Sequence, residues 1–142
     1  MGQVYRQGLG EFFMDDLHRY EAVWAVPTPA VQQHLLAVLP DNARARVLQH
    51  RPYSMVSYAW GQRYQQSNQW AIETLAAAME PATIRTRDQA QAWLQFKGYV
   101  PTTLHIRALQ RLGARVGSAH IAFDDHPPPQ RFANQIETVT AD

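Results

Sequence analysis

The stretch that most constrains this chain runs from Tyr64 to Met79, where a polar turn leads into a helix-forming segment. Apolar residues recur there at helical spacing and share one side, which predicts a helix with a buried face. These residues are Ala71, Ile72, Leu75, Ala78 and Met79. Ser67 or Asn68 suits the N-cap, because its side-chain oxygen can accept a free N–H of the first turn. We therefore expect a central helix over 67–79, entered through a polar turn.

The composition indicates one globular domain over residues 1–142. Hydrophobic residues make up 46% of the 142 positions and charged residues 18%, which suits a chain with a real core. The net charge of +1 creates no large field, so a nucleic-acid partner is not favoured. There is no cysteine, which excludes a disulfide framework and a thiol nucleophile. We expect no cofactor.

The first residues carry no targeting signal that we recognise. Residues 1–6 lack the apolar centre of a signal peptide and open without cap or turn chemistry. No apolar run approaches the ~20 residues of a transmembrane helix, so we expect no membrane span. The abrupt opening leads us to expect a fragment of a longer chain that lacks its N-terminal part.

Before the central helix, the patterns predict two strands and two helices. Residues 19–26 are aromatic and β-branched, apolar on both faces, and followed by Pro27, which predicts a central strand. Thr28 and the proline after it start a helix that Pro40 ends. Asp41 or the next residue caps a second helix that runs to about residue 49. A short alternation over 53–58 predicts another strand.

After the central helix, a capping box at Thr86 starts another helix. Apolar residues over 104–112 mark one more helix, and residues 118–124 read as a strand. The prolines at 127–129 predict a stiff spacer, and 132–140 a last edge strand. Helices and strands mix without a βαβ rhythm, so we predict an α+β fold. A mainly antiparallel sheet would pack against the central helix.

Ser67 is the first candidate for chemistry, and two interpretations stay open. In one, it is an N-cap that stabilises the helix. In the other, it is a nucleophile at the N-terminus of a helix, where the dipole favours an anion. A serine hydroxyl is too weak an acid for that field to ionise. Ser67 would therefore need its own base within hydrogen-bond reach.

The second candidate is the segment from His120 to Pro127. On a strand, His120 and Asp124 share a face, and Asp125 and His126 follow in the turn. Three interpretations stay open. The aspartates can bond backbone N–H groups of the turn. A His–Asp pair can serve as base and orienter. His120, Asp124 and His126 can also ligate a metal, although no helical i, i+4 histidine pair supports this.

Two motifs carry a resemblance to a known family. The stretch YQQSNQWAIETLA (64–76) and the later FDDHP (123–127) resemble a bacterial family, domain of unknown function 2145. That family is similar to circularly permuted papain-like proteins of the NlpC/P60 type, which cleave or transfer amide and ester bonds. The resemblance implies a papain-like fold and a periplasmic or exported location. Many relatives carry cysteine where Ser67 stands, and a histidine on an upstream strand.

The resemblance implies a hydrolase constellation that we expect to be incomplete in this chain, because Ser67 stands where relatives carry cysteine and their upstream histidine strand would lie ahead of Met1. If the constellation does act, Ser67 is the nucleophile, His120 the base and Asp124 its orienter. Asn68 or its neighbour Gln69 would then help to polarise the substrate carbonyl.

The alternative is a non-catalytic module that binds a peptide, a glycan or a partner protein. It predicts a groove beside Trp70 and no base near Ser67. Asn68, Gln69 and Trp70 would contact the ligand, for which a peptide or cell-wall-related molecule is the candidate class.

Overall fold

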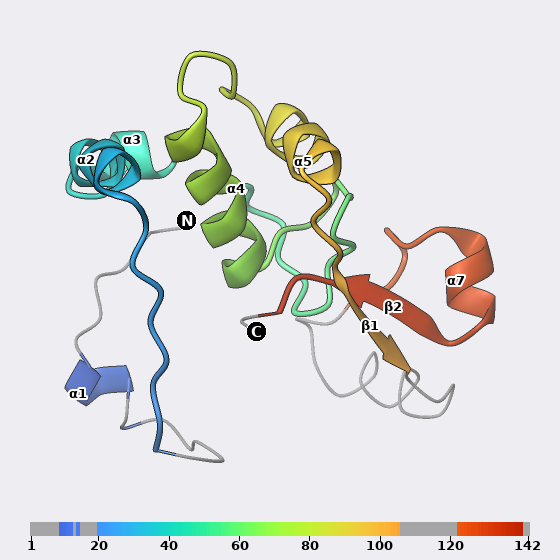
Figure 1. The fold of residues 1–142 in the computed structure, drawn as a ribbon. Coiled ribbons are helices and arrows are strands. Elements are labelled where there is room, and N and C mark those ends of the chain that lie inside the picture. Colours follow the sequence, from blue (N-terminus) through green and yellow to red (C-terminus); the bar gives the residue numbers. More distant parts are fainter. Residues whose placement is uncertain (1–8, 13, 15–19, 106–121, 141–142) are drawn as a thin grey trace.

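The computed structural model describes residues 9–12, 14, 20–105 and 122–140 (Figure 1). Its elements in chain order are α1 (Leu9–Phe12), α2 (Pro29–Val38), α3 (Asn42–Ala45), α4 (Ser67–Met79), α5 (Arg87–Phe96), β1 (Thr102–His105), α7 (Pro128–Phe132) and β2 (Gln135–Thr138). Helix α4 lies between α2 and α5 and packs against both (Figure 1). None of the helices in these ranges is long and apolar enough to cross a bilayer.

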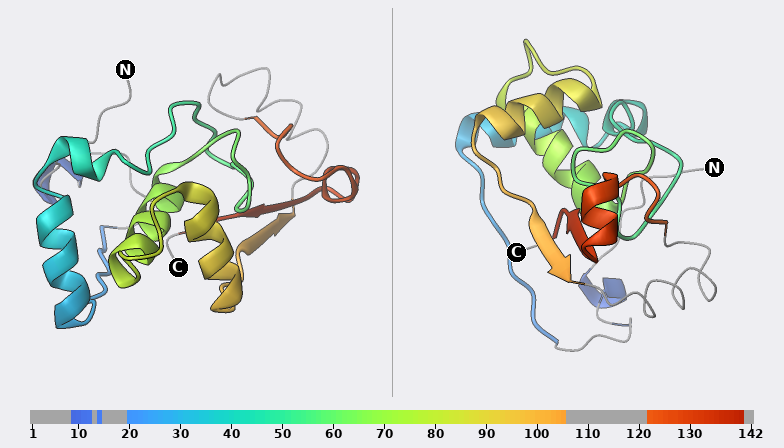
Figure 2. Two further views of the ribbon diagram at one scale, coloured as in Figure 1. Left: turned by 90° about the horizontal axis from the view of Figure 1, so that it is seen from above. Right: turned by 90° about the vertical axis from the view of Figure 1, so that its right-hand side faces the viewer.

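The two strands form a small antiparallel sheet. Thr102 pairs with Thr138, and Leu104 pairs with Ile136, whose side chain is 2% exposed. The sheet and α7 lie on the side of α4 away from α2 (Figures 1 and 2). Helices with a two-stranded antiparallel sheet make the fold α+β, as predicted.

Local signals predicted most helix limits but not the capping box, because Thr86 precedes α5 without a side-chain cap bond. Helix α2 begins at Pro29 and ends before Pro40. Asp41 caps α3, and its Oδ1 accepts the Ala43 N–H at 2.8 Å, although this helix ends sooner than predicted. Helix α5 is followed by Gly98 at a φ of +80°, the left-handed conformation that favours glycine at a helix end.

The predicted central strand over 19–26 is wrong. Its described part, residues 20–26, is extended but pairs with no strand in the described ranges (Figure 1). Val23 is 99% exposed and Trp24 is 78% exposed. Side-chain composition favours an extended backbone here, but a strand also needs a neighbour for its N–H and C=O groups. Pairing is not a local property.

The other strand predictions fare unevenly. Residues 53–58 form no strand, and only Tyr53 makes an isolated bridge, to Gln65. Residues 122–124 are not in a strand either, and 118–121 lie outside the described residues. The last strand, predicted over 132–140, is confirmed in its central part as β2, whereas Phe132 belongs to α7.

Two other predictions are corrected. The helix over 104–112 is wrong at its start, where Leu104 belongs to β1, and 106–112 are not described. The prolines at 127–129 are no spacer, because Pro128 begins α7. The fixed φ of proline suits the first helical turn.

The buried face of helix α4 matches the predicted one only in part, because Ala78 is buried and Ile72 packs against the core. Ala71 and Met79 are exposed, whereas Gln69, Glu73 and Ala76 are at most 1% exposed. The last three follow i, i+4, i+7 spacing and so form one row on the helix. The innermost row of the central helix is therefore largely polar.

A buried ion pair explains this polar row. Glu73 accepts from Arg87 of α5 through both oxygens, at 2.9 and 3.2 Å. Gln65 donates to the same carboxylate at 2.6 Å, and Gln91 at 2.7 Å. Glu73 is 0% exposed and Arg87 is 8% exposed, so the pair is shielded from water. Helices α4 and α5 and the preceding loop meet at this carboxylate.

Arg87 also forms hydrogen bonds with backbone carbonyls of the loop that leads into α4. Its guanidinium donates to the carbonyls of Gly61, Gln62 and Tyr64, at 3.1, 3.4 and 3.2 Å. These carbonyls belong to an irregular segment that is in no strand of the described ranges. Partly buried backbone carbonyls also need a donor, and here the Arg87 side chain supplies it.

Removal of the carboxylate charge should strongly destabilise the fold. We expect Glu73→Gln to lower the free energy of unfolding by about 3 kcal/mol or more, because it leaves the buried Arg87 charge without its partner. Urea unfolding followed by circular dichroism measures this. Arg44→Gln is the control: it breaks an exposed pair with Asp41, and such pairs contribute about 1 kcal/mol at most. Equal effects of the two substitutions would contradict the role assigned to Glu73.

Candidate functional site

The cap of α4 is Gln66, which corrects the prediction of Ser67 or Asn68. The Gln66 side-chain oxygen accepts the Asn68 N–H at 3.0 Å. Its amide nitrogen donates to the Thr138 hydroxyl at 3.4 Å and to the Val139 carbonyl. Gln66 therefore caps the helix and ties it to the end of β2. A longer side chain can do both, which serine cannot.

Ser67 is the first residue of α4, and its side chain is exposed. In the described part of the chain, no group forms a hydrogen bond with the Ser67 hydroxyl. His120, the predicted base, lies outside the described residues. The pairing of Ser67 with His120 therefore stays a prediction.

The two residues that follow Asn68 are already bonded within the protein. The Gln69 oxygen accepts from the Ser57 hydroxyl at 2.8 Å, and its nitrogen donates to the Tyr58 and Ala59 carbonyls, both at 3.1 Å. Both amide hydrogens of Gln69 are thus used. The indole N–H of Trp70 donates to the Ala45 carbonyl at 3.1 Å, which leaves the ring face as its contact surface.

Asp124, predicted to orient His120, makes an ion pair with Arg63 at 3.0 Å through Oδ2. Its Oδ1 is buried and has no hydrogen-bond partner among the described residues. The described His–Asp pair is made by its neighbours instead. Nδ1 of His126 lies 3.0 Å from Oδ1 of Asp125, whose Oδ2 accepts the Tyr58 N–H at 2.7 Å.

The Asp125–His126 pair is buried. The His126 side chain is 0% exposed, and its Nε2 has no partner in the described ranges. A carboxylate can only accept, so this contact favours the proton on Nδ1. The Tyr58 ring lies 5.3 Å from the imidazole, and burial, followed by the negative charge of Glu137, raises the pKa of its hydroxyl. No three potential metal ligands cluster within the described part of the chain.

Two cavities flank the contact between α2 and α4. The first, the Trp70 cavity, has a volume of about 420 Å³. Its lining combines the exposed segment before α2 with both helices and includes Val26, Pro27, Leu39, Trp70, Ala71 and Leu75. A hollow beside Trp70 is what a binding module predicts.

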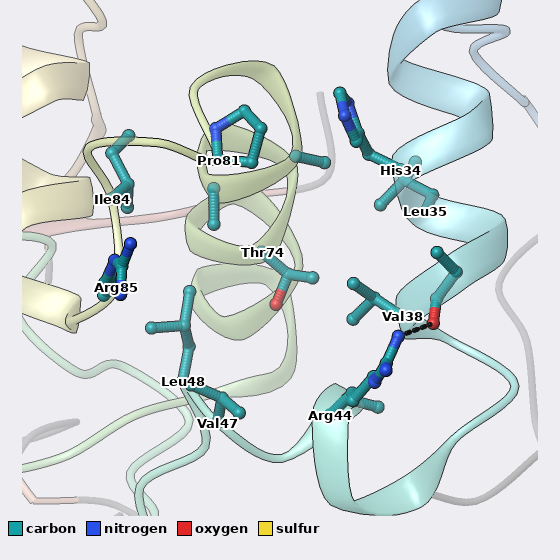
Figure 3. Close-up of a pocket in the computed structure, with 14 residues that line it drawn as sticks. His34, Leu35, Val38, Arg44, Val47, Leu48, Thr74, Pro81, Ile84 and Arg85 are labelled. Carbon is teal, nitrogen blue, oxygen red and sulfur yellow. Dashed lines mark hydrogen bonds between the residues drawn. The ribbon is translucent and has the colours of Figure 1, made fainter.

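The second, the Arg85 cavity, has a volume of about 430 Å³ (Figure 3). Its walls come from α2, α3, the segment after α3, α4 and the turn before α5. Apolar side chains predominate, including Leu35, Val38, Leu48, Ala77, Ala78 and Ile84. Leu35 and Thr74 line both cavities.

Comparison with known families decides the relationship of this chain. The model of DUF2145, described as an uncharacterized protein conserved in bacteria, matches residues 1–142. The chain belongs to this family. No curated protein and no solved structure matches it.

Sequence reasoning missed several groups of this DUF2145 chain. It did not single out Glu73, Arg87, Gln91 or Thr74. One signal was present: Gln69 and Glu73 stand four residues apart, as do Arg87 and Gln91, so each pair shares a helix face. Complementary polar faces on consecutive helices indicate a buried network between them.

The cap of α4 can be tested by comparing adjacent substitutions. We expect Gln66→Ala to lower the free energy of unfolding by about 2 kcal/mol, because it removes a cap and the link to β2. Ser67→Ala, at an exposed position with no described bond, should change it by less than about 0.5 kcal/mol. Thermal and urea unfolding measure both. A larger effect at Ser67 would contradict the assignment of Gln66 as the cap.

Proposed function

We propose that this DUF2145 domain is papain-like in architecture and acts by binding a ligand rather than by hydrolysis. One observation carries the binding proposal: an apolar cavity lies on each side of the α2–α4 contact, and one of them is beside Trp70. Cavities of about 300–1,000 Å³ with mainly apolar walls are typical of small-molecule sites. Both cavities fall within that range.

The start of α4 supports the papain-like part of the proposal. In papain-like proteins, the reactive residue begins a helix that packs on an antiparallel sheet. Here Ser67 begins α4, and its neighbour Gln66 bonds Thr138 and Val139 at the end of an antiparallel strand. The residue at the reactive position is an exposed serine.

The chemistry of serine argues against hydrolysis. A serine nucleophile needs a base that hydrogen-bonds its hydroxyl. In the described ranges, Ser67 has no such bond, and Asp125 rather than Asp124 holds a histidine. Both amide hydrogens of Gln69 bond loop carbonyls, so this residue does not offer a free donor to a substrate carbonyl.

Cavity-filling substitutions test the binding proposal. We expect wild-type protein to bind Nile red, a neutral environment-sensitive dye, with saturable fluorescence enhancement. Ala71→Leu narrows the Trp70 cavity and Ala77→Leu the Arg85 cavity, so at least one should weaken dye binding several-fold. Ala92→Leu, on the exposed side of α5, is the matched control and should have no effect. Absence of saturable binding, or equal affinities in all four proteins, would refute the proposal.

A fluorophosphonate probe tests for hydrolysis, because it labels only an activated serine. We expect wild-type protein and Ser67→Ala to show the same background labelling by gel fluorescence and intact mass. Labelling of wild type that disappears in Ser67→Ala would show an activated nucleophile and favour the hydrolase.

A further inference from the structure

The Arg85 cavity contains a polar atom without a partner. Thr74 lies on α4 where this helix faces α2 (Figure 3), and its side chain is 8% exposed. Its hydroxyl is buried and makes no hydrogen bond in the described part of the chain. A threonine inside a helix commonly bonds the carbonyl one turn back. A buried hydroxyl without a partner is unfavourable, and a ligand carbonyl in the cavity would satisfy it.

The charged side chains that line the cavity have one sign. Arg44 and Arg85 are among the lining residues, which include no carboxylate. Arg44 is partly engaged, because it donates to the Ala37 carbonyl at 3.3 Å and lies 3.7 Å from Asp41. Arg85 is exposed and makes no ion pair with a described residue. Its guanidinium is therefore available for an anionic group at the cavity.

We infer that the Arg85 cavity binds the C-terminal end of a short apolar peptide, an inference that rests on the proposed binding function. Apolar side chains of the peptide contact the walls formed by Val38, Leu48 and Ile84. A peptide carbonyl accepts a hydrogen bond from Thr74, and the terminal carboxylate pairs with Arg85.

Other ligand classes fit these groups less well. A plain acyl chain with a carboxylate would satisfy Arg85 but place methylene groups against the Thr74 hydroxyl. A cationic peptide would be repelled by the positive charges of Arg44 and Arg85. An apolar peptide with a free carboxylate satisfies the walls, the hydroxyl and the guanidinium together.

Calorimetry with the full chain tests this choice with three probes. They are acetyl-Leu-Leu-Leu with a free carboxylate, the same peptide with a C-terminal amide, and dodecanoate. We expect the free acid to bind about tenfold more tightly than the amide, since of the two peptides only the acid forms a charge-assisted bond with Arg85.

Two substitutions separate the contributions. Arg85→Gln should reduce affinity for the acid to that for the amide and leave the amide unaffected. Thr74→Val removes the hydroxyl while keeping the shape, and should weaken both peptides by about threefold or more without affecting dodecanoate. Arg51→Gln, at an exposed arginine outside the cavity, is the control and should change nothing.

The outcomes separate this inference from the binding proposal. Equal affinities for acid and amide, or no effect of Arg85→Gln, would overturn the carboxylate contact while Nile red binding persisted. Peptide binding that is unaltered by Thr74→Val would overturn the carbonyl contact in the same way. If the wild-type protein bound none of the three probes and did not bind Nile red, the proposed binding function would be overturned as well.

Discussion

The buried carboxylate of Glu73 connects the elements in the middle of this chain. It accepts a hydrogen bond from Arg87, and Arg87 in turn donates to the carbonyls of Gly61 and Tyr64. A buried ion pair adds little stability compared with apolar residues of similar volume, but the loss of one partner is costly. We infer that the pair contributes conformational specificity instead, because Arg87 binds the carbonyls of a loop that pairs with no strand in the described ranges. Helix α5 is fixed against α4 by the same bonds.

Because one face of α4 forms this polar network, the orientation of the helix is set and its other faces are available for apolar contacts. Gln69 and Glu73 bond the preceding loop and α5, so polar groups gather on one side of the helix. Thr74 lies on another side, toward α2 (Figure 3), and it lines the Arg85 cavity together with the small side chains of Ala77 and Ala78. The helix thus has a filled polar side and a hollow apolar side. The cavities follow from small residues on a helix whose orientation is set elsewhere.

The sequence predicted those features that depend on neighbouring residues. Pro29, Asp41 and Gly98 act through their own backbone or side-chain geometry, so the helix limits they mark could be predicted. Strands require partners far along the chain, and the apolar segment around Val23 has none in the described part. The polar row on the buried face of α4 was missed for a related reason. Periodicity counts apolar residues, and it treats a buried Glu73 as a surface residue because its partner lies on the next helix.

In the candidate site, too, features set by neighbouring residues were predicted and features set by distant residues were not. The motif correctly placed Ser67 at the first turn of a helix, but the cap is Gln66, since its contacts with Thr138 and Val139 come from the far end of the chain. The Arg85 cavity joins segments from His34 to Arg85 and the Trp70 cavity segments from Ala25 to Leu75, juxtapositions that no local pattern contains. The long polar side chains at the start of α4, Gln66 and Gln69, form hydrogen bonds within the protein. Under the proposed binding function, recognition depends on apolar area and on a few remaining groups, and Thr74 and Arg85 line the same cavity.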